Sequence, residues 1–300
     1  MDIVGHRRIF YTMSGALVLA SVGALVLFGL RLGIDFTGGT LLEVTFEGDR
    51  PSLEAVTERL NAIGLTAPRI QPVGTTGLFI RLPHIDEATH ERLIAALGDG
   101  VREKRFDAIG PTIGRELARK SILAIALVIV LIVSYIAYAF RKVSEPMASW
   151  TYGVVTVVAL VHDVIIPAGF FAVAGHVAAF EVDTLFVTAI LTILGFSVHD
   201  TIVVFDRIRE NLKKKAGASA FAALVNRSVT ETLVRSINTS LTVVLAIGAV
   251  YVLGGASTKA FTLTLMIGIV VGTYSSICIA SPLLVTWQHL RERRSRHPHP

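Results

Sequence analysis

The chain has 300 residues, of which 52% are hydrophobic and only 17% are charged. Its mean hydropathy of +0.63 excludes an ordinary soluble domain, so the composition predicts an integral membrane protein. The formal net charge of +5 comes from Lys and Arg that gather beside apolar segments. That pattern sets membrane orientation and does not indicate nucleic-acid binding. The single cysteine, Cys278, excludes an intrachain disulfide.

Six apolar segments are each long enough to cross a bilayer, which takes about 20 helical residues. We expect spans at residues 9–30, 121–140, 148–175, 185–205, 232–253 and 260–290. No convincing cleavage site follows the first, so we interpret it as an uncleaved helix. Basic residues occupy the N-terminus, the loop at 141–145, a partly helical loop at 207–231 and the tail at 291–300. The positive-inside rule therefore predicts that both termini are cytoplasmic.

One long hydrophilic insertion, residues 31–120, separates residues 1–30 from the membrane segments at 121–290. Its pattern reads strand, helix, two strands joined by a turn, helix and strand. Ser52 and Asp86 stand where the two helices should begin. The order β-α-β-β-α-β is that of the ferredoxin-like fold. The predicted fold is therefore an α-helical membrane protein whose six-helix bundle carries one small, extracytoplasmic, ferredoxin-like α+β domain between helices 1 and 2.

The fourth span carries a carboxylate at membrane depth. Asp200 lies about 16 residues into a segment that needs about 20 to cross the bilayer. A charge there costs roughly 2.5–3.5 kcal/mol, and function is the usual reason to carry it. A polar face surrounds it, with Ser197, Thr201, Thr192 and Thr188. The alternative is a polar contact that only joins two helices. His199 is a candidate to share the Asp200 proton.

The fifth span begins with a polar stripe at helical spacing: Arg235, Asn238, Thr239 and Thr242. Because the fourth and fifth spans are antiparallel neighbours, Arg235 and Asp200 match in depth, and we predict an ion pair. The alternative is that Arg235 snorkels to the headgroups. Burial disfavours a charged carboxylate and a nearby cation favours it. A motion that joins and separates the pair would therefore bind and release a proton, with no other cofactor.

The third span holds a second polar pair, His162 and Asp163. Adjacent helical residues point about 100° apart, so we do not expect the two to face one ligand together. They are either a second relay group or a hydrogen-bonded structural pair. No metal-ligand spacing accompanies them, and no nucleophile elbow occurs, so we predict neither a metal site nor an enzyme.

Two motifs carry a resemblance to a known family. Residues 195–211, GFSVHDTIVVFDRIREN, resemble the signature of the SecF family and include Asp206 and Arg207. The segment Gly33–Thr40, GIDFTGGT, resembles the second family element, with Gly33, Asp35, Phe36, Gly38 and Gly39. That segment lacks the Gly-x-Gly-x-x-Gly order of a nucleotide site, so we interpret it as the junction between helix 1 and the outer domain. His199 stands where the family usually has Asn.

The resemblance covers nearly all of residues 1–290. It implies a subunit that uses the proton motive force to export polypeptides across the bacterial cytoplasmic (inner) membrane, with Asp200 and Arg235 at positions associated with proton passage. The implied partners are a SecD-like subunit, a SecYEG-type channel, the exported polypeptide and membrane lipid. The alternative is a small-molecule exporter of the resistance-nodulation-division type. Such exporters usually double the six-helix unit and carry larger outer domains.

Overall fold

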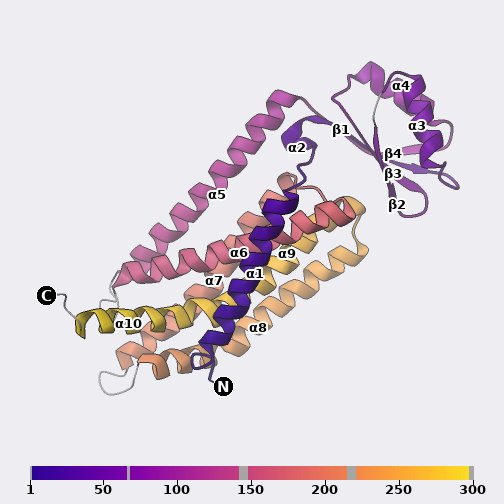
Figure 1. Ribbon diagram of the computed structural model, residues 1–300. Helices are drawn as coiled ribbons and strands as arrows, with labels where there is room; N and C mark the ends of the chain where they lie inside the picture. Colours follow the sequence, from indigo (N-terminus) through magenta and orange to yellow (C-terminus); the bar gives the residue numbers. More distant parts are fainter. Residues whose placement is uncertain (1, 66–67, 142–147, 215–220, 297–300) are drawn as a thin grey trace. The chain divides into compact units, whose positions relative to one another are not determined.

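The computed structural model describes residues 2–65, 68–141, 148–214 and 221–296 (Figure 1). The predicted loop charges Lys142, Glu145 and Lys215 and residues 297–300 of the basic tail lie outside these ranges. The chain divides into two compact units. One is helical and comprises Met1–Arg31 with Leu123–Pro300, and the other is an α+β domain, Leu32–Ile122.

Six helices in the described part of the chain are long and apolar enough to span a membrane. Five are continuous: α1 Arg7–Phe28, α5 Pro111–Ala139, α6 Ser149–Ala178, α7 Thr184–Lys214 and α8 Phe221–Leu253. The sixth is composite and runs through α9 Ala256–Ser275, the π-helix η1 Ser276–Ala280 and α10 Ser281–Arg296. The predicted spans are all confirmed as helices.

Several helices extend beyond their predicted ends. α5 begins at Pro111, α7 continues to Lys214 and α8 begins at Phe221. The basic loop at 207–231, which the sequence predicts to be partly helical, is therefore helical at 207–214 and 221–231. Ion pairs three or four residues apart support these polar ends, because such pairs stabilise helices. They join Glu210 to Arg207 and Lys214, and Glu231 to Arg227.

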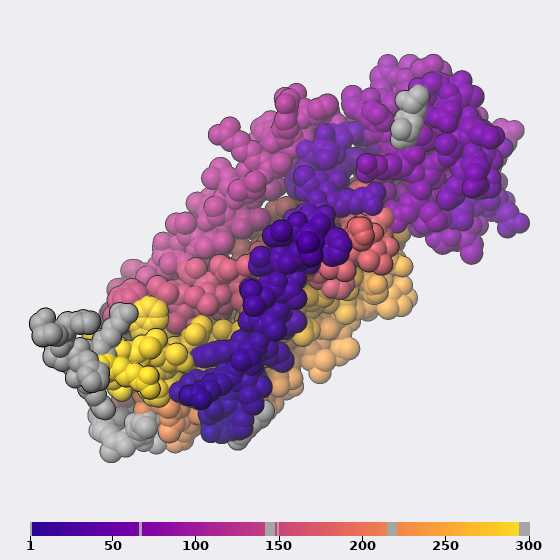
Figure 2. Space-filling model, in the orientation of Figure 1, coloured from indigo at the N-terminus to yellow at the C-terminus, as the bar shows by residue number. Residues whose placement is uncertain are grey.

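Burial divides the membrane helices into an inner and an outer set. In α6 and in α7, 50% of the most apolar stretch is buried within the chain, and in the sixth span 67% of it is buried. The corresponding buried share in α5 is only 6%. α7 packs against α8 and α9, and α6 packs against α1, which lies on the surface of the helical unit in Figure 2. The inward faces of α6, α7 and α9 can therefore carry polar groups away from lipid.

The α+β domain is built on a four-stranded antiparallel sheet of order β2-β3-β1-β4. Its elements are β1 Gly39–Phe46, α3 Leu53–Ala62, β2 Arg69–Val73, β3 Gly77–Leu82, α4 Glu87–Leu97 and β4 Val101–Ile109. The Ser52 hydroxyl and the Asp86 carboxylate cap α3 and α4 as predicted. This is the ferredoxin-like arrangement that the sequence predicts.

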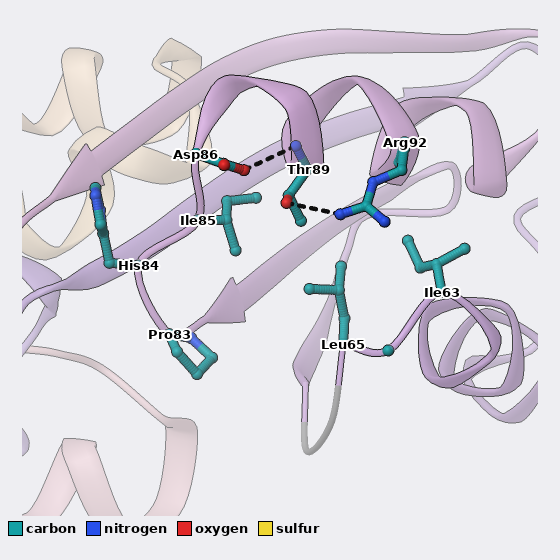
Figure 3. A pocket seen from close by; sticks show the side chains of 9 residues that line it. Ile63, Leu65, Pro83, His84, Ile85, Asp86, Thr89 and Arg92 are labelled. Atoms are coloured by element: carbon teal, nitrogen blue, oxygen red, sulfur yellow. Dashed lines mark hydrogen bonds between the residues drawn. The ribbon is translucent and has the colours of Figure 1, made fainter.

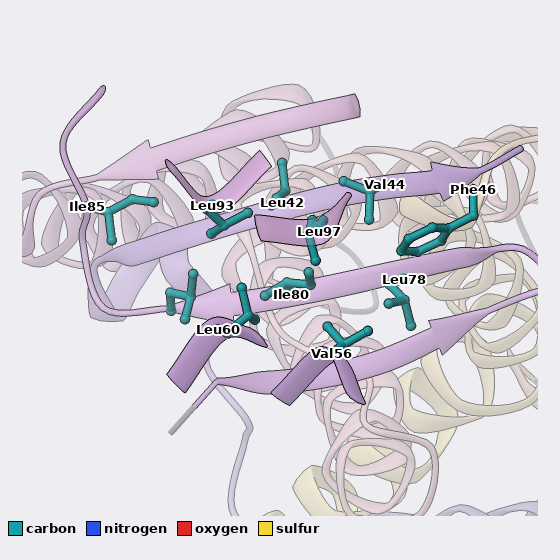
Figure 4. Packing of buried hydrophobic residues seen from close by; sticks show 11 residues of the cluster. Leu42, Val44, Phe46, Val56, Leu60, Leu78, Ile80, Ile85, Leu93 and Leu97 are labelled. Atoms are coloured by element: carbon teal, nitrogen blue, oxygen red, sulfur yellow. The ribbon is translucent and has the colours of Figure 1, made fainter. Parts of the chain in front are cut away.

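One face of the sheet and the two helices enclose the domain core (Figure 4). Alternate residues of β1 and β3 point into it, as a period of two requires. The core consists of Leu42, Val44, Phe46, Val56, Leu60, Leu78, Ile80, Leu82, Ile85, Leu93 and Leu97. These apolar contacts stabilise the domain without a disulfide, as the single cysteine requires.

The glycine motif is a close-packed junction inside the α+β unit. Its middle forms the short helix α2, Ile34–Thr37, with Asp35 in the first turn and Phe36 buried. Gly38 has φ +74°, and a Cβ there would lie 2.7 Å from the Pro111 Cα. A Cβ on Gly39, with φ +136°, would lie 2.8 Å from the Leu82 carbonyl oxygen. Both positions exclude a side chain for conformational and steric reasons.

A hollow of about 540 Å³ lies between the end of α3 and the start of α4 (Figure 3). Its polar groups serve the fold of α4. The backbone N–H of Thr89 donates to Asp86, and the Thr89 hydroxyl accepts from Arg92. Hydrogen bonding to Thr89 lowers the pKa of Asp86, which keeps this capping carboxylate charged.

His90 lies between two glutamates in the α+β domain. Its ring stacks on Phe106 at 3.8 Å, and its Nε2 and Nδ1 lie 2.7 Å from Glu103 and 3.2 Å from Glu87. Burial lowers the pKa of His90, but the two glutamates outweigh it and leave the pKa above its ordinary value. Protonation therefore stabilises the folded domain. This stability is complete below the unfolded pKa of about 6.5 and is lost as pH rises through the folded pKa.

We expect the wild-type domain to lose stability as pH rises above about 6.5, and the His90→Gln domain to change much less. Pulse proteolysis of the α+β domain in the purified full chain measures this difference. An identical pH dependence in the two proteins would contradict the role of His90.

Candidate functional site

The inner helices turn a set of polar side chains toward one another in the middle of the helical unit. We call this set the inner polar cluster: His162 and Asp163 of α6, Ser197, Asp200 and Thr201 of α7, Ser236 and Ser240 of α8, Thr273 and Ser275 of α9, and Ser276 of η1. All are at most 8% exposed. Buried polar groups in a membrane protein are costly and are typical of a functional site.

Asp163 is hydrogen-bonded to three other members of the cluster. Its Oδ2 accepts from the Ser197 hydroxyl at 2.5 Å and from the Ser275 hydroxyl at 2.7 Å, and its Oδ1 lies 2.8 Å from His162 Nδ1. One carboxylate therefore joins α6 to α7 and α9. His162 and Asp163 therefore form the hydrogen-bonded pair that the sequence offers as one of two alternatives.

The second ring nitrogen of His162, Nε2, is buried and has no hydrogen-bond partner among the described residues. The ring packs near Tyr274, whose hydroxyl bonds with Ser14 at 2.9 Å and donates to the Phe10 carbonyl. Polar contacts thus extend from the inner polar cluster to α1 through Tyr274 and Ser14. His162 lies between Asp163 and Tyr274.

Asp200 has a different environment. It lies on α7 one turn after Ser197, and Thr273 and Ser236 face its carboxylate from α9 and α8. Its Oδ2 and the Ser236 Oγ have no hydrogen-bond partner among the described residues. Thr273 bonds instead with Ser240 on α8. Asp200 therefore has fewer hydrogen bonds than Asp163 to stabilise its charged form.

Small residues allow α7 and α9 to approach closely at the cluster. A Cβ on Gly272 would lie 2.9 Å from the Ser197 Cβ, and one on Gly268 would lie 2.1 Å from the Ile193 Cδ1. Ser276 continues this four-residue spacing and bonds with Thr201 at 2.9 Å. The π-helix η1 begins at the same residue, and π-helical turns occur frequently at functional sites.

Asp200 and Arg235 do not form the predicted ion pair. α8 turns Thr232, Ser236 and Ser240 inward. Arg235 is exposed because it precedes Ser236 by one residue and so points about 100° away from that face. Asn238 is likewise exposed, and Thr239 is partly exposed with its hydroxyl bonded to the Arg235 carbonyl.

Other predicted site residues lie outside the cluster. His199, Thr188 and Thr192 are exposed, so only Ser197 and Thr201 of the predicted polar face accompany Asp200 inward. Asp206 pairs with Arg209 at the polar end of α7. Arg207 pairs there with Glu210 and Glu231, each at 2.6 Å. The residues of the glycine motif serve the junction in the α+β unit.

Sequence reasoning missed Thr273, Ser275 and Ser276. The signal for them is the spacing of small residues in the sixth span, at Gly268, Gly272 and Ser276. Such a spacing is typical of a close helix–helix contact in membranes. No three His, Cys, Asp or Glu side chains gather as metal ligands within the described ranges.

The fold and the cluster define a multi-pass membrane protein with ionisable groups enclosed by its inner helices. Residues 89–290 match the family "Protein export membrane protein SecD/SecF, C-terminal", and residues 23–49 match "SecD/SecF GG Motif". The chain is 46% identical to the protein translocase subunit SecF of Thermobaculum terrenum, over 96% of this chain and 94% of that protein. It is 38% identical to SecF of Anaerolinea thermophila over the same shares. The chain belongs to the SecF family of protein translocase subunits.

Two solved SecDF structures resemble the chain. SecDF of Thermus thermophilus, described as a translocon-associated membrane protein, has a TM-score of 0.82 and 35% identity over 96% of this chain. SecDF in a super-membrane-facing form has a TM-score of 0.71 and 31% identity over the whole chain. The chain spans 39% and 40% of the length of those proteins.

Proposed function

We propose that the chain is one half of a proton-driven protein-export complex in the bacterial cytoplasmic (inner) membrane. The observation that carries this proposal is Asp200, a buried carboxylate beside hydroxyls of α8 and α9, with one oxygen that has no hydrogen-bond partner among the described residues. Membership of the SecF family supplies the process, which is polypeptide export. The proton is the coupling ion, and the proposal includes no cofactor, metal or enzymatic reaction.

In this proposal Asp200 takes up and releases the proton, and Asp163 keeps the surrounding helices in place. Ser236 and Thr273 offer hydroxyls that can both donate and accept beside Asp200. One charge that crosses 100 mV delivers about 2.3 kcal/mol. That energy changes a conformational equilibrium by more than tenfold, because about 1.4 kcal/mol corresponds to a factor of ten.

A SecD-like subunit is the proposed partner in the membrane, and a SecYEG-type channel delivers the exported polypeptide. The exposed stripe of Arg235 and Asn238 on α8 supports a membrane partner, since these side chains are costly against lipid. The greater length of the SecDF proteins supports it as well. We propose that the stripe faces the partner subunit.

The proposed orientation places both termini in the cytoplasm and the α+β domain outside. Basic residues support it, because Arg209, Lys213 and Lys214 follow the apolar part of α7 and Arg227 precedes that of α8. In this orientation the α+β domain meets the polypeptide as it leaves the channel.

Precursor accumulation tests the export function. A bacterium depleted of its own SecF receives this chain together with the SecD-like partner from the same source. We expect secreted precursors to clear, and the partner to co-purify with the chain. Persistent precursors with both subunits at normal abundance would contradict export and favour a small-molecule exporter.

A further inference from the structure

A pocket of about 350 Å³ lies between the last turns of α5 and of α7, apart from the inner polar cluster. It is lined by Tyr135, Tyr138, Ala139, Arg141, Arg209 and Lys213. Two tyrosines and three cations thus line one cavity at the polar ends of two membrane helices. Neither the proton site nor the α+β domain uses these residues.

The pocket has an excess of positive charge. Arg209 pairs with Asp206, whereas Arg141 and Lys213 have no carboxylate partner within the described ranges. Arg141 is nevertheless held in place. Its guanidinium lies 3.7 Å from the centre of the Tyr138 ring, and its Nη1 donates to the Tyr138 carbonyl at 3.1 Å. Two cations without an acidic partner favour an anionic ligand, and the fixed guanidinium reduces the entropy lost on binding.

The surroundings place the pocket at headgroup depth. The preceding turns of α5 expose Leu127, Val130 and Leu131 by 53–60%, a surface suited to acyl chains. Tyr135 and Tyr138 follow, 57% and 64% exposed, and Arg141 comes next. The order apolar, tyrosine, arginine is that of a helix leaving a bilayer through its interface.

We propose that this pocket binds the headgroup of an anionic glycerophospholipid. Arg141 and Lys213 contact the phosphodiester, the tyrosines contact the glycerol region, and the acyl chains lie along the exposed leucines of α5. Basic pockets between membrane helices recognise such headgroups. The bound lipid would link the end of α5 to α7, the helix that carries Asp200.

Native mass spectrometry of the purified full chain in an uncharged detergent tests the proposal. The probes are phosphatidylglycerol and phosphatidylcholine with the same acyl chains. We expect wild type to retain phosphatidylglycerol preferentially and the Arg141→Gln/Lys213→Gln variant to bind it roughly 30-fold more weakly. Arg8→Gln, which removes an exposed cation that does not line the pocket, should keep the preference.

Two further variants separate a loss of charge from a failure to fold. Arg141→Lys/Lys213→Arg should retain the preference, and Lys213→Gln alone should lose part of it if the double variant does not fold. Three results would overturn the proposal: no preference in wild type, an equal loss in Arg8→Gln, or displacement of the lipid by millimolar inorganic phosphate. The last would identify the pocket as a site for free phosphate.

Discussion

Asp200→Asn is expected to reduce proton-driven export at least tenfold while the protein stays folded. Asparagine has the volume of aspartate and hydrogen-bonds with its neighbours, but it cannot take up and release a proton. The variant therefore loses the roughly 2.3 kcal/mol that each proton delivers per 100 mV. Membrane vesicles with an imposed proton gradient measure the effect, through the export of a precursor and the decay of the gradient.

Two variants serve as controls for Asp200. Asp200→Glu keeps an acid and should retain part of the activity. Glu116→Gln also removes one carboxylate from a membrane helix, but Glu116 is 60% exposed and pairs with Lys120, so export should be unchanged. Normal gradient-driven export in Asp200→Asn would remove Asp200 from the mechanism.

Asp163→Ala is expected to destabilise the helical unit. The change breaks three hydrogen bonds, with His162, Ser197 and Ser275, and leaves those groups buried. At about 0.6–1.7 kcal/mol per bond in a membrane protein, the loss amounts to roughly 2–5 kcal/mol. Thermal unfolding of the purified chain in detergent measures it as a lower melting temperature.

Asp163→Asn separates packing from charge at the same position. It keeps the shape and some of the hydrogen bonds, so we expect a smaller loss of stability than for alanine. Thr192→Val is the matched control, because this exposed hydroxyl bonds only to its own helix and its loss should leave stability unchanged. A melting temperature for Asp163→Ala equal to that of wild type would show that the three bonds do not join the helices.

Much of the fold could be predicted because its signals are local. Apolar length marks the six spans, and strand alternation with the caps Ser52 and Asp86 marks the α+β domain. Helix ends were less predictable. Charged residues mark where a helix leaves the membrane, yet pairs such as Lys214 with Glu210 keep it helical in water.

The site could be predicted only in part. Depth in the membrane identifies Asp200 and Asp163, because a buried charge is costly wherever its helix packs. Periodicity groups Arg235 with Asn238 but does not tell which face of α8 points inward. That choice depends on packing against α7 and α9, where Ser236 fits and Arg235 does not. Asp163 and Ser275 are 112 residues apart, so their contact has no local signal.

Infrared difference spectroscopy of membranes that contain the chain and its partner tests the role of Asp200 most directly. Protonated carboxylic acids have a carbonyl stretch that ionised carboxylates lack. We predict a wild-type band that changes between high and low pH, that is absent from Asp200→Asn and that is retained in Glu116→Gln. An unchanged pH-dependent band in Asp200→Asn would contradict the assignment of the proton site to Asp200.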